Sequence, residues 1–120
     1  MARHYKELVV WQRAVELVTQ VYRVTPDFPD SEKFGLVSQL RRADVSVPSN
    51  IAEGQGRLTG GEFNQFLGHA RGSLFETETQ LVIARNLNLV SKAKFERLNE
   101  LIDEVGRLLN GLMRSLRSEK

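Results

Sequence analysis

The amino-acid sequence predicts an all-α fold, an up-and-down antiparallel bundle of four helices. Apolar residues recur at alternating steps of three and four through four segments, as they do on one face of a helix. Short stretches rich in glycine, proline and capping residues separate these segments, and no stretch alternates as a strand does. Four helices of about 20 to 28 residues with short loops favour antiparallel neighbours. The 120 residues are expected to form a single domain, 1–120.

The first helix is predicted over residues 5–25, and it carries more apolar surface than one stripe requires. One row of apolar residues steps by three and four along it: Leu8, Trp11, Val15, Val18 and Tyr22. Two further rows stand beside the first: Val10, Leu17 and Val24, then Ala14 and Val21. A helix with this much apolar surface is expected to be buried on two sides.

The second helix is predicted over residues 31–57, after a loop, TPDFPDSEK, that contains two prolines. Its apolar row is formed by Leu36, Leu40, Ala43, Val47 and Ile51. Pro48 lies inside this helix and has no N–H to donate to the carbonyl group of Asp44. We therefore expect one helix that is kinked at Pro48, and not two helices.

The third helix is predicted over residues 60–87. Thr59 and Glu62 have the spacing of a capping box, which marks its first turn. Gly68 and Gly72 are four residues apart and offer a flat patch where a neighbouring helix could approach closely. The apolar row of this helix is formed by Phe63, Leu67, Ala70, Leu74, Thr77, Leu81 and Ala84.

The fourth helix follows a loop over residues 86–91, and Ser91 is its expected N-cap. The alternation of three and four is unbroken along it: Phe95, Leu98, Ile102, Val105, Leu109, Leu112 and Leu116. This regular row is typical of a helix that packs along one face against its neighbours.

Composition narrows the classes of function. The 17 basic and 15 acidic residues give a net charge of +2, which permits a nucleic-acid partner without requiring one. The absence of cysteine excludes disulfides, thiolate catalysis and cysteine-bound metals. The first residues lack the pattern of a signal peptide, and no segment approaches the ~20 apolar residues of a membrane span. We expect a cytoplasmic protein with no membrane partner.

The sequence lacks the motifs of catalysis, metal binding and cofactor binding. Its two histidines, His4 and His69, have no second ligand at a metal-binding spacing. The glycines at 54–61 follow no predicted strand and precede no Gly-Lys-Ser or Gly-Lys-Thr, so they are interpreted as helix ends and not as a phosphate-binding loop. We predict no enzyme, no metal and no cofactor, with a pocket between subunits as the remaining catalytic alternative.

A polar cluster surrounds Pro48 in the second helix and extends to the third. Its predicted members are Arg41, Arg42, Asn50, Glu53 and Glu76. The leading interpretation is a structural ion-pair network. It would pair Glu53 with Arg57 one turn on, and Glu76 or Glu78 with Arg41 or Arg42 across the helix interface. A ligand contact or a subunit contact is the alternative.

Five arginines are candidates for nucleic-acid binding: Arg41, Arg42, Arg57, Arg71 and Arg85. They lie on the second and third helices, and a ring of subunits would repeat any patch that they form. The alternative is an ordinary solvated helix face, because most of these arginines have acidic neighbours. The aromatic residues suited to base stacking are expected in the core.

Several runs of residues resemble a known family. They are Leu8-Val9-Val10-Trp11-Gln12, Gln39-Leu40-Arg41-Arg42-Ala43, Val45-Ser46-Val47-Pro48-Ser49-Asn50-Ile51-Ala52-Glu53-Gly54 and Gly72-Ser73-Leu74-Phe75-Glu76. These runs resemble the four-helix-bundle proteins known from intervening sequences in bacterial 23S ribosomal RNA genes. The resemblance covers nearly the whole chain and implies a homopentameric barrel around a central channel. It also points to the accessory proteins of diversity-generating retroelements, similar pentamers that bind a reverse transcriptase and nucleic acid.

Two functional hypotheses follow. The first is a non-enzymatic oligomer, a scaffold or adaptor that binds RNA or another nucleic acid through a basic surface. The second is a protein–protein interaction module with no nucleic-acid binding, in which the arginines form structural pairs. The resemblance implies no catalytic residues, since its family has no established activity.

Overall fold

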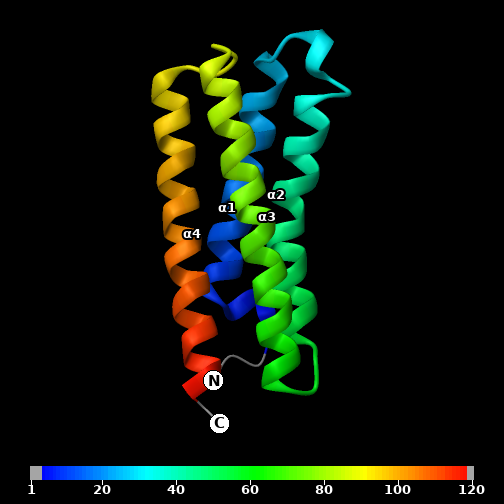
Figure 1. Cartoon of the computed structure of the whole chain (residues 1–120), viewed down its shortest axis with the longest axis vertical. Coiled ribbons are helices and arrows are strands. Elements are labelled where there is room, and N and C mark those ends of the chain that lie inside the picture. Colours follow the sequence, from blue (N-terminus) through cyan, green and yellow to red (C-terminus); the bar gives the residue numbers. More distant parts are fainter. Residues whose placement is uncertain (1–3, 119–120) are drawn as a thin grey trace.

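A computed structural model describes residues 4–118 of the chain, and these residues form an up-and-down bundle of four α-helices (Figure 1). The helices are α1 (Val9–Val24), α2 (Leu36–Gln55), α3 (Gly60–Asn86) and α4 (Lys92–Ser118). Three short 3-10 helices accompany them: η1 (Tyr5–Glu7), η2 (Thr25–Asp27) and η3 (Asp30–Glu32). No strand occurs between residues 4 and 118. The predicted all-α fold is confirmed.

The ends of α3 are fixed by local hydrogen bonds. At its start, Thr59 Oγ1 accepts a hydrogen bond from the backbone N–H of Glu62 at 3.1 Å. At its end, the N–H of Leu89 donates to the carbonyl of Ala84 at 2.9 Å, while Asn88 has a positive φ of 62°. This is a Schellman motif, with asparagine in the left-handed conformation that few other residues tolerate. The predicted bounds of this helix are confirmed to within one residue.

The first two helices begin later than predicted. Leu8 has an extended backbone (φ −75°, ψ 125°), which separates η1 from α1. Gly35 (φ −107°, ψ −107°) interrupts the chain before α2. The carboxylate of Glu32 then accepts a hydrogen bond from the N–H of Leu36 at 3.2 Å, in place of an N-cap side chain. These breaks depend on backbone angles of single residues, which the apolar pattern does not encode.

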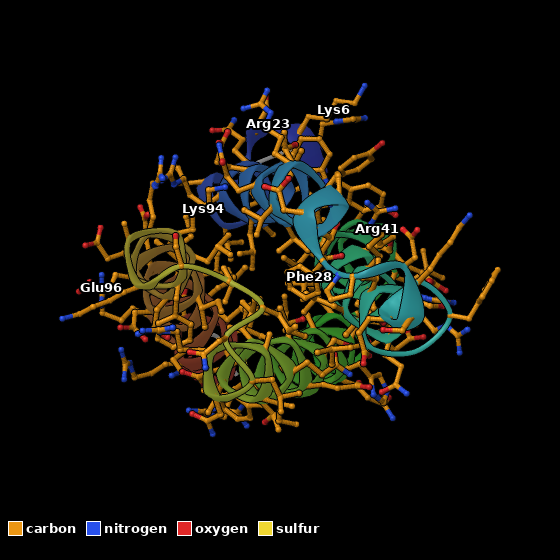
Figure 2. The ribbon with its side chains drawn as sticks, turned by 90° about the horizontal axis from the view of Figure 1, so that it is seen from above. Lys6, Arg23, Phe28, Arg41, Lys94 and Glu96 are labelled. Carbon is orange, nitrogen blue, oxygen red and sulfur yellow. The ribbon has the colours of Figure 1, made fainter. Side chains whose placement is uncertain are left out.

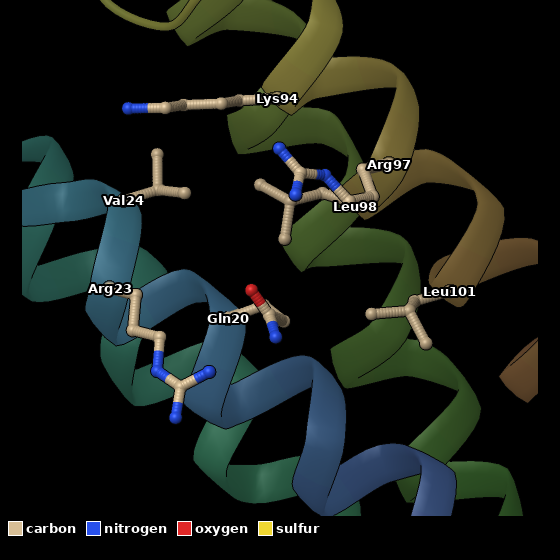
Figure 3. A pocket seen from close by; sticks show the side chains of 7 residues that line it. All are labelled: Gln20, Arg23, Val24, Lys94, Arg97, Leu98 and Leu101. Carbon is tan, nitrogen blue, oxygen red and sulfur yellow. The ribbon is translucent and has the colours of Figure 1, made fainter.

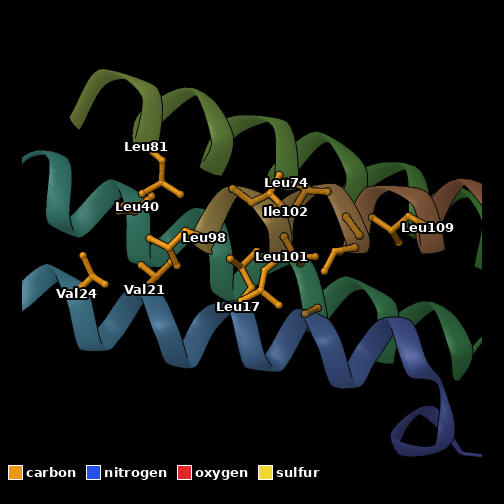
Figure 4. Close-up of a cluster of buried hydrophobic side chains, with 14 of the residues drawn as sticks. Leu17, Val21, Val24, Leu40, Leu74, Leu81, Leu98, Leu101, Ile102 and Leu109 are labelled. Carbon is orange, nitrogen blue, oxygen red and sulfur yellow. The ribbon is translucent and has the colours of Figure 1, made fainter. Parts of the chain in front are cut away.

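One apolar core runs the length of the bundle (Figure 4). Its largest fully buried side chains come from all four helices: Leu17, Leu40, Ile51, Leu67, Leu74, Leu81, Leu98 and Leu109. Phe28, in the loop after η2, points into one end of the bundle, whereas Lys6, Arg23 and Glu96 point outward (Figure 2). At the same end, Ser91 Oγ accepts from the N–H of Lys94 at 3.2 Å and starts α4 as predicted.

The helix α1 buries a different row from the one predicted as its main stripe. Its buried residues are Val10, Ala14, Leu17, Val21 and Val24. The predicted main row lies on the flank instead: Trp11 is only partly buried against the core, and Tyr22 is 42% exposed. The contacts of α1 are with α2 and α4, so α3 lies diagonally across the bundle. Three apolar rows lie side by side on this helix, so the apolar pattern alone does not decide which row faces the core.

The helices α2 and α3 make the most extensive contact of any pair. A Cβ atom added at Gly54 would lie 2.6 Å from the Cβ of Phe66, so only glycine fits there. Nearer the middle, the hydroxyl of Ser73 donates to Ser46 Oγ at 2.8 Å. The helix α2 continues unbroken through Pro48, which confirms one helix and not two. The kink at this proline stays a prediction.

Candidate functional site

The structure does not bring the five candidate arginines together. Arg41 faces α1, where its Nε and Nη2 donate to Thr25 Oγ1 at 3.0 and 2.7 Å. Its guanidinium carbon also lies 4.3 Å from the ring centre of Tyr22, a cation–π contact. Arg42, one position along, is exposed and has no hydrogen-bond or ion-pair partner within residues 4–118. Of these two arginines, only Arg42 has its side chain available to a ligand.

The other three candidates are also engaged, at separate places on the bundle. Arg57 donates to Glu53 at 3.1 Å near the α2–α3 turn. Arg71 donates to Asn110 of α4 at 3.0 Å. Arg85, at the opposite end of α3, donates to the carbonyl of Val90 at 3.3 Å in the α3–α4 loop. Four of the five predicted arginines therefore make contacts within the chain, in four different places.

The predicted polar cluster is only partly an ion-pair network. The expected pair of Glu53 with Arg57 is present. Asn50 does not join it, because its amide donates to the carbonyl and hydroxyl oxygens of Ser46 at 2.8 and 2.9 Å. Glu76 accepts from Gln80, its neighbour one turn on, at 3.5 Å.

The predicted ion pair between α2 and α3 is wrong. Neither Glu76 nor Glu78 pairs with Arg41 or Arg42 within the part of the chain that the structure describes. The reason is geometric, because Arg41 extends toward α1, where a hydroxyl group and an aromatic ring hold it. Its partner Thr25 lies beyond the end of α1, in a segment that the apolar pattern treats only as a loop.

Asp44 is the most unusual member of the polar segment of α2. Its side chain is fully buried, and neither carboxyl oxygen has a hydrogen bond of good geometry within residues 4–118. Burial raises the pKa of Asp44 to about 8, although the backbone N–H of Val45 and the charge of Arg41 oppose this rise. The acid is therefore mostly protonated at neutral pH. Pro48, one turn further along α2, has no backbone N–H to donate to the carbonyl group of Asp44.

The outward side of α3 carries a continuous uncharged stripe, which we call the α3 outer stripe. Its members step by four and three along the helix: Gly68, Gly72, Phe75, Thr79 and Val82. Phe75 is 54% exposed and Val82 is 42% exposed. The hydroxyl of Thr79 donates to the carbonyl of Phe75 at 2.8 Å, so its polar group is already satisfied within the helix.

Within residues 4–118, no other helix covers the two glycines of this stripe. A Cβ atom added at Gly68 or Gly72 would meet no atom within 4 Å. The two glycines thus form the flat patch that the sequence predicts, but it faces away from the bundle. Charged residues flank the stripe, with Arg71 and Glu78 on one side and Glu76 on the other. An uncharged centre with a charged rim is the usual composition of a protein interface.

A second exposed apolar surface lies on α1, diagonally opposite α3. It is the predicted main row of this helix, and we call it the α1 flank: Trp11, Val15, Val18 and Tyr22. All of these side chains are partly accessible, and Tyr22 is the most exposed. The molecule therefore presents two different apolar surfaces, on two helices that are diagonal in the bundle.

Other classes of site find no support in the described part of the chain. Residues 4–118 contain no cluster of three or more histidine, cysteine or acidic side chains able to hold a metal ion. His4 caps η1, where its Nδ1 accepts from the N–H of Lys6 at 3.2 Å, and His69 packs edge-on against Phe66. Over the same residues, no helix has both the length and the apolarity needed to cross a bilayer.

Comparison with known proteins agrees with the fold and with the residue patterns. No curated protein sequence matches the chain. A solved structure of a protein with unknown function from the S23 ribosomal protein family of Bacteroides thetaiotaomicron is similar to it, with a TM-score of 0.81. The two are 22% identical, and the similarity covers 88% of this chain and 98% of the other. The family model described as 23S rRNA-intervening sequence protein matches residues 6–111. The chain belongs to the family of 23S rRNA-intervening sequence proteins.

Proposed function

We propose that this protein is a non-enzymatic subunit of a homo-oligomer, which acts as a scaffold or adaptor. The observation that supports this proposal is the α3 outer stripe, where Phe75 and Val82 are exposed between positions that carry no charge. Scattered apolar residues on a surface need no explanation, but a contiguous uncharged stripe with a charged rim is typical of an interface. The two open glycines allow a partner helix to approach the backbone of α3 closely.

The positions of the two apolar surfaces favour a ring. If the α3 outer stripe of one copy contacts the α1 flank of the next, the contact joins two different surfaces, and such heterologous contacts generate closed rings or open filaments. The two surfaces lie on helices that are diagonal in the bundle, so each copy has one neighbour on either side. We propose five copies, because the resemblance of the sequence implies a pentamer.

Light scattering tests the assembly directly. A pentamer has a mass of about 68 kDa, five times the 13.6 kDa of the chain. The substitution Phe75→Glu places a charge in the centre of the α3 outer stripe and should dissociate the oligomer. Phe34→Glu is the matched control, since Phe34 is 89% exposed and lies on neither apolar surface. A monomeric wild-type protein, or an oligomer unaffected by Phe75→Glu, contradicts the proposal.

Nucleic acid is the second candidate partner, and the observation that favours it is Arg42. This side chain is exposed and unpaired, and a ring would repeat it in every subunit. If RNA binds there, a gel shift at about 50 mM salt should detect it, and the affinity should fall steeply as salt is raised. Arg42→Gln should weaken binding, whereas Arg57→Gln, which removes an arginine already paired with Glu53, should weaken it less.

In the alternative proposal, this protein is an adaptor that binds a protein partner and no nucleic acid. Its support is that Arg41, Arg57, Arg71 and Arg85 all make contacts within the chain. A pull-down that enriches one protein and is insensitive to nuclease, together with no RNA shift at low salt, would decide for this alternative. Retention of RNA that is lost on nuclease treatment would decide against it.

A further inference from the structure

A pocket of about 160 Å³ lies between α1 and α4, at the end of the bundle where α4 begins (Figure 3). Its apolar lining comes from Val24, Leu98 and Leu101, which are 8%, 2% and 8% exposed. Its polar lining is dominated by basic side chains, among them Arg97. The pocket is separate from both the α3 outer stripe and the α1 flank.

The basic side chains of this pocket differ in their freedom to bind an anion. Lys94 is neutralised by Asp27, with its Nζ 3.1 Å from the carboxylate. Arg97 and Arg23 have no hydrogen-bond or ion-pair partner within residues 4–118. Figure 3 shows Arg97 reaching across the pocket from α4, between Lys94 and Gln20, while the guanidinium of Arg23 is at the rim and turned away. Arg97 is therefore the group best placed to meet a ligand.

The lining of this pocket favours a negative charge, because it carries three basic side chains and no acidic one. Arg97 also lines a neighbouring pocket with Glu16, Glu100 and Glu104, and there the amide nitrogen of Gln20 donates to Glu16 at 2.7 Å. Arg97 is itself exposed, and its unpaired guanidinium can form charge-assisted hydrogen bonds to an anion beside the buried leucines.

We propose that this pocket binds a small organic acid, whose carboxylate pairs with Arg97 and whose short apolar body lies on Leu98 and Leu101. A guanidinium group can hold both oxygens of a carboxylate in parallel hydrogen bonds. Inorganic phosphate fits less well, because it presents oxygen atoms on every side and would place some of them against the leucines without partners. The volume is below the roughly 300 Å³ at which drug-sized sites begin, which suits a ligand of a few carbon atoms.

The test uses the full chain in its native oligomeric state and three probes: hexanoate, its neutral analogue hexanamide, and inorganic phosphate. Binding is measured by ligand-observed NMR at constant ionic strength. Hexanoate should bind with a Kd on the order of 1 mM, as expected for a ligand of this size. Hexanamide and phosphate should each bind at least about tenfold more weakly. Hexanamide lacks the negative charge that pairs with Arg97, and phosphate lacks the apolar body that lies on the leucines.

Two variants assign the binding to the pocket. Arg97→Gln should raise the Kd for hexanoate about tenfold or more, because it removes the charged hydrogen-bond donor. Arg107→Gln is the matched control on the same helix, since Arg107 lines the α3–α4 side and should leave the Kd unchanged. Absence of hexanoate binding at about 10 mM, ten times the expected Kd, overturns the proposal. Equal binding of phosphate, or equal affinity of the Arg97→Gln variant, overturns it as well.

Discussion

The buried acid Asp44 makes a quantitative prediction about stability and pH. Its folded-state pKa is about 8, against 3.8 for the free side chain. Between these values the folded state holds a proton that the unfolded state has lost, so the free energy of unfolding falls as pH rises. The slope is about 1.4 kcal/mol per pH unit in the middle of this range. From about pH 5.5 to about pH 7.5, the loss amounts to roughly 2.5 kcal/mol, a large part of the stability of a small domain.

The sign of this effect separates Asp44 from ordinary carboxylates. A carboxylate with a lowered pKa stabilises the fold above its unfolded pKa, and that stability is lost in acid. Asp44 has a raised pKa, so the stability that it contributes is fully present below pH 3.8 and is lost as pH rises through 8. Most carboxylates no longer titrate between about pH 5.5 and about pH 7.5, so they contribute little to the slope in this interval.

Urea denaturation at fixed protein concentration measures this slope. Asp44→Asn removes the titrating group and should flatten the dependence on pH, whatever the amide does to the absolute stability. Asp103→Asn, an exposed acid on α4, is the control and should leave the wild-type slope unchanged. Both variants keep His4 and His69, so the histidines are the same in all the proteins compared. Equal slopes for the wild type and Asp44→Asn would refute the reasoning.

Four further predictions concern packing, helix propensity and capping, and each is measured as a change in the free energy of unfolding. Gly54→Ala should destabilise the protein by about 1–3 kcal/mol, because the added Cβ would lie 2.6 Å from the Cβ of Phe66. Gly68→Ala should stabilise the dissociated subunit by roughly 0.5–1 kcal/mol through helix propensity, since nothing lies within 4 Å of the new Cβ; a loss of stability would contradict the open space seen there. Thr59→Ala removes the N-cap of α3 and should cost about 1 kcal/mol. Leu17→Ala, at a fully buried position, should cost about 2–5 kcal/mol, and a smaller cost would mean that the site collapses around the cavity.

The sequence predicted best those features that depend on neighbours in the chain. The capping box at Thr59 and the N-cap Ser91 fixed two helix starts, because each needs only residues within one turn. The number of helices and their order followed from periodicity for the same reason. The fold could therefore be predicted almost entirely.

The candidate site could be predicted only in part, because side-chain partners depend on packing between distant segments. Arg41 or Arg42 was expected to meet Glu76 or Glu78, whereas Arg41 meets Thr25. Asp44 is buried because of the way in which α2 faces the core. The polar residues next to Asp44 in the sequence do not indicate this orientation. The α3 outer stripe did leave a signal, since Gly68, Gly72, Phe75, Thr79 and Val82 include no charged residue. This gap in charge along the outer face of α3 is present in the sequence itself.

The seam between α1 and α4 has a kinetic consequence. Its ion pair, Arg13 with Glu104 at 3.0 Å, joins residues 91 positions apart, whereas α2 and α3 are joined by one short turn. Closing a long loop is slow compared with pairing adjacent helices, so we expect the α2–α3 hairpin to form first and the seam to close last. Contacts that form after the transition state act on the unfolding rate. Arg13→Ala should accordingly speed unfolding and leave the folding rate nearly unchanged in stopped-flow experiments, and an equal effect on both rates would contradict this order. A ligand seated in the seam would then slow the opening of the bundle and lengthen the lifetime of the folded subunit.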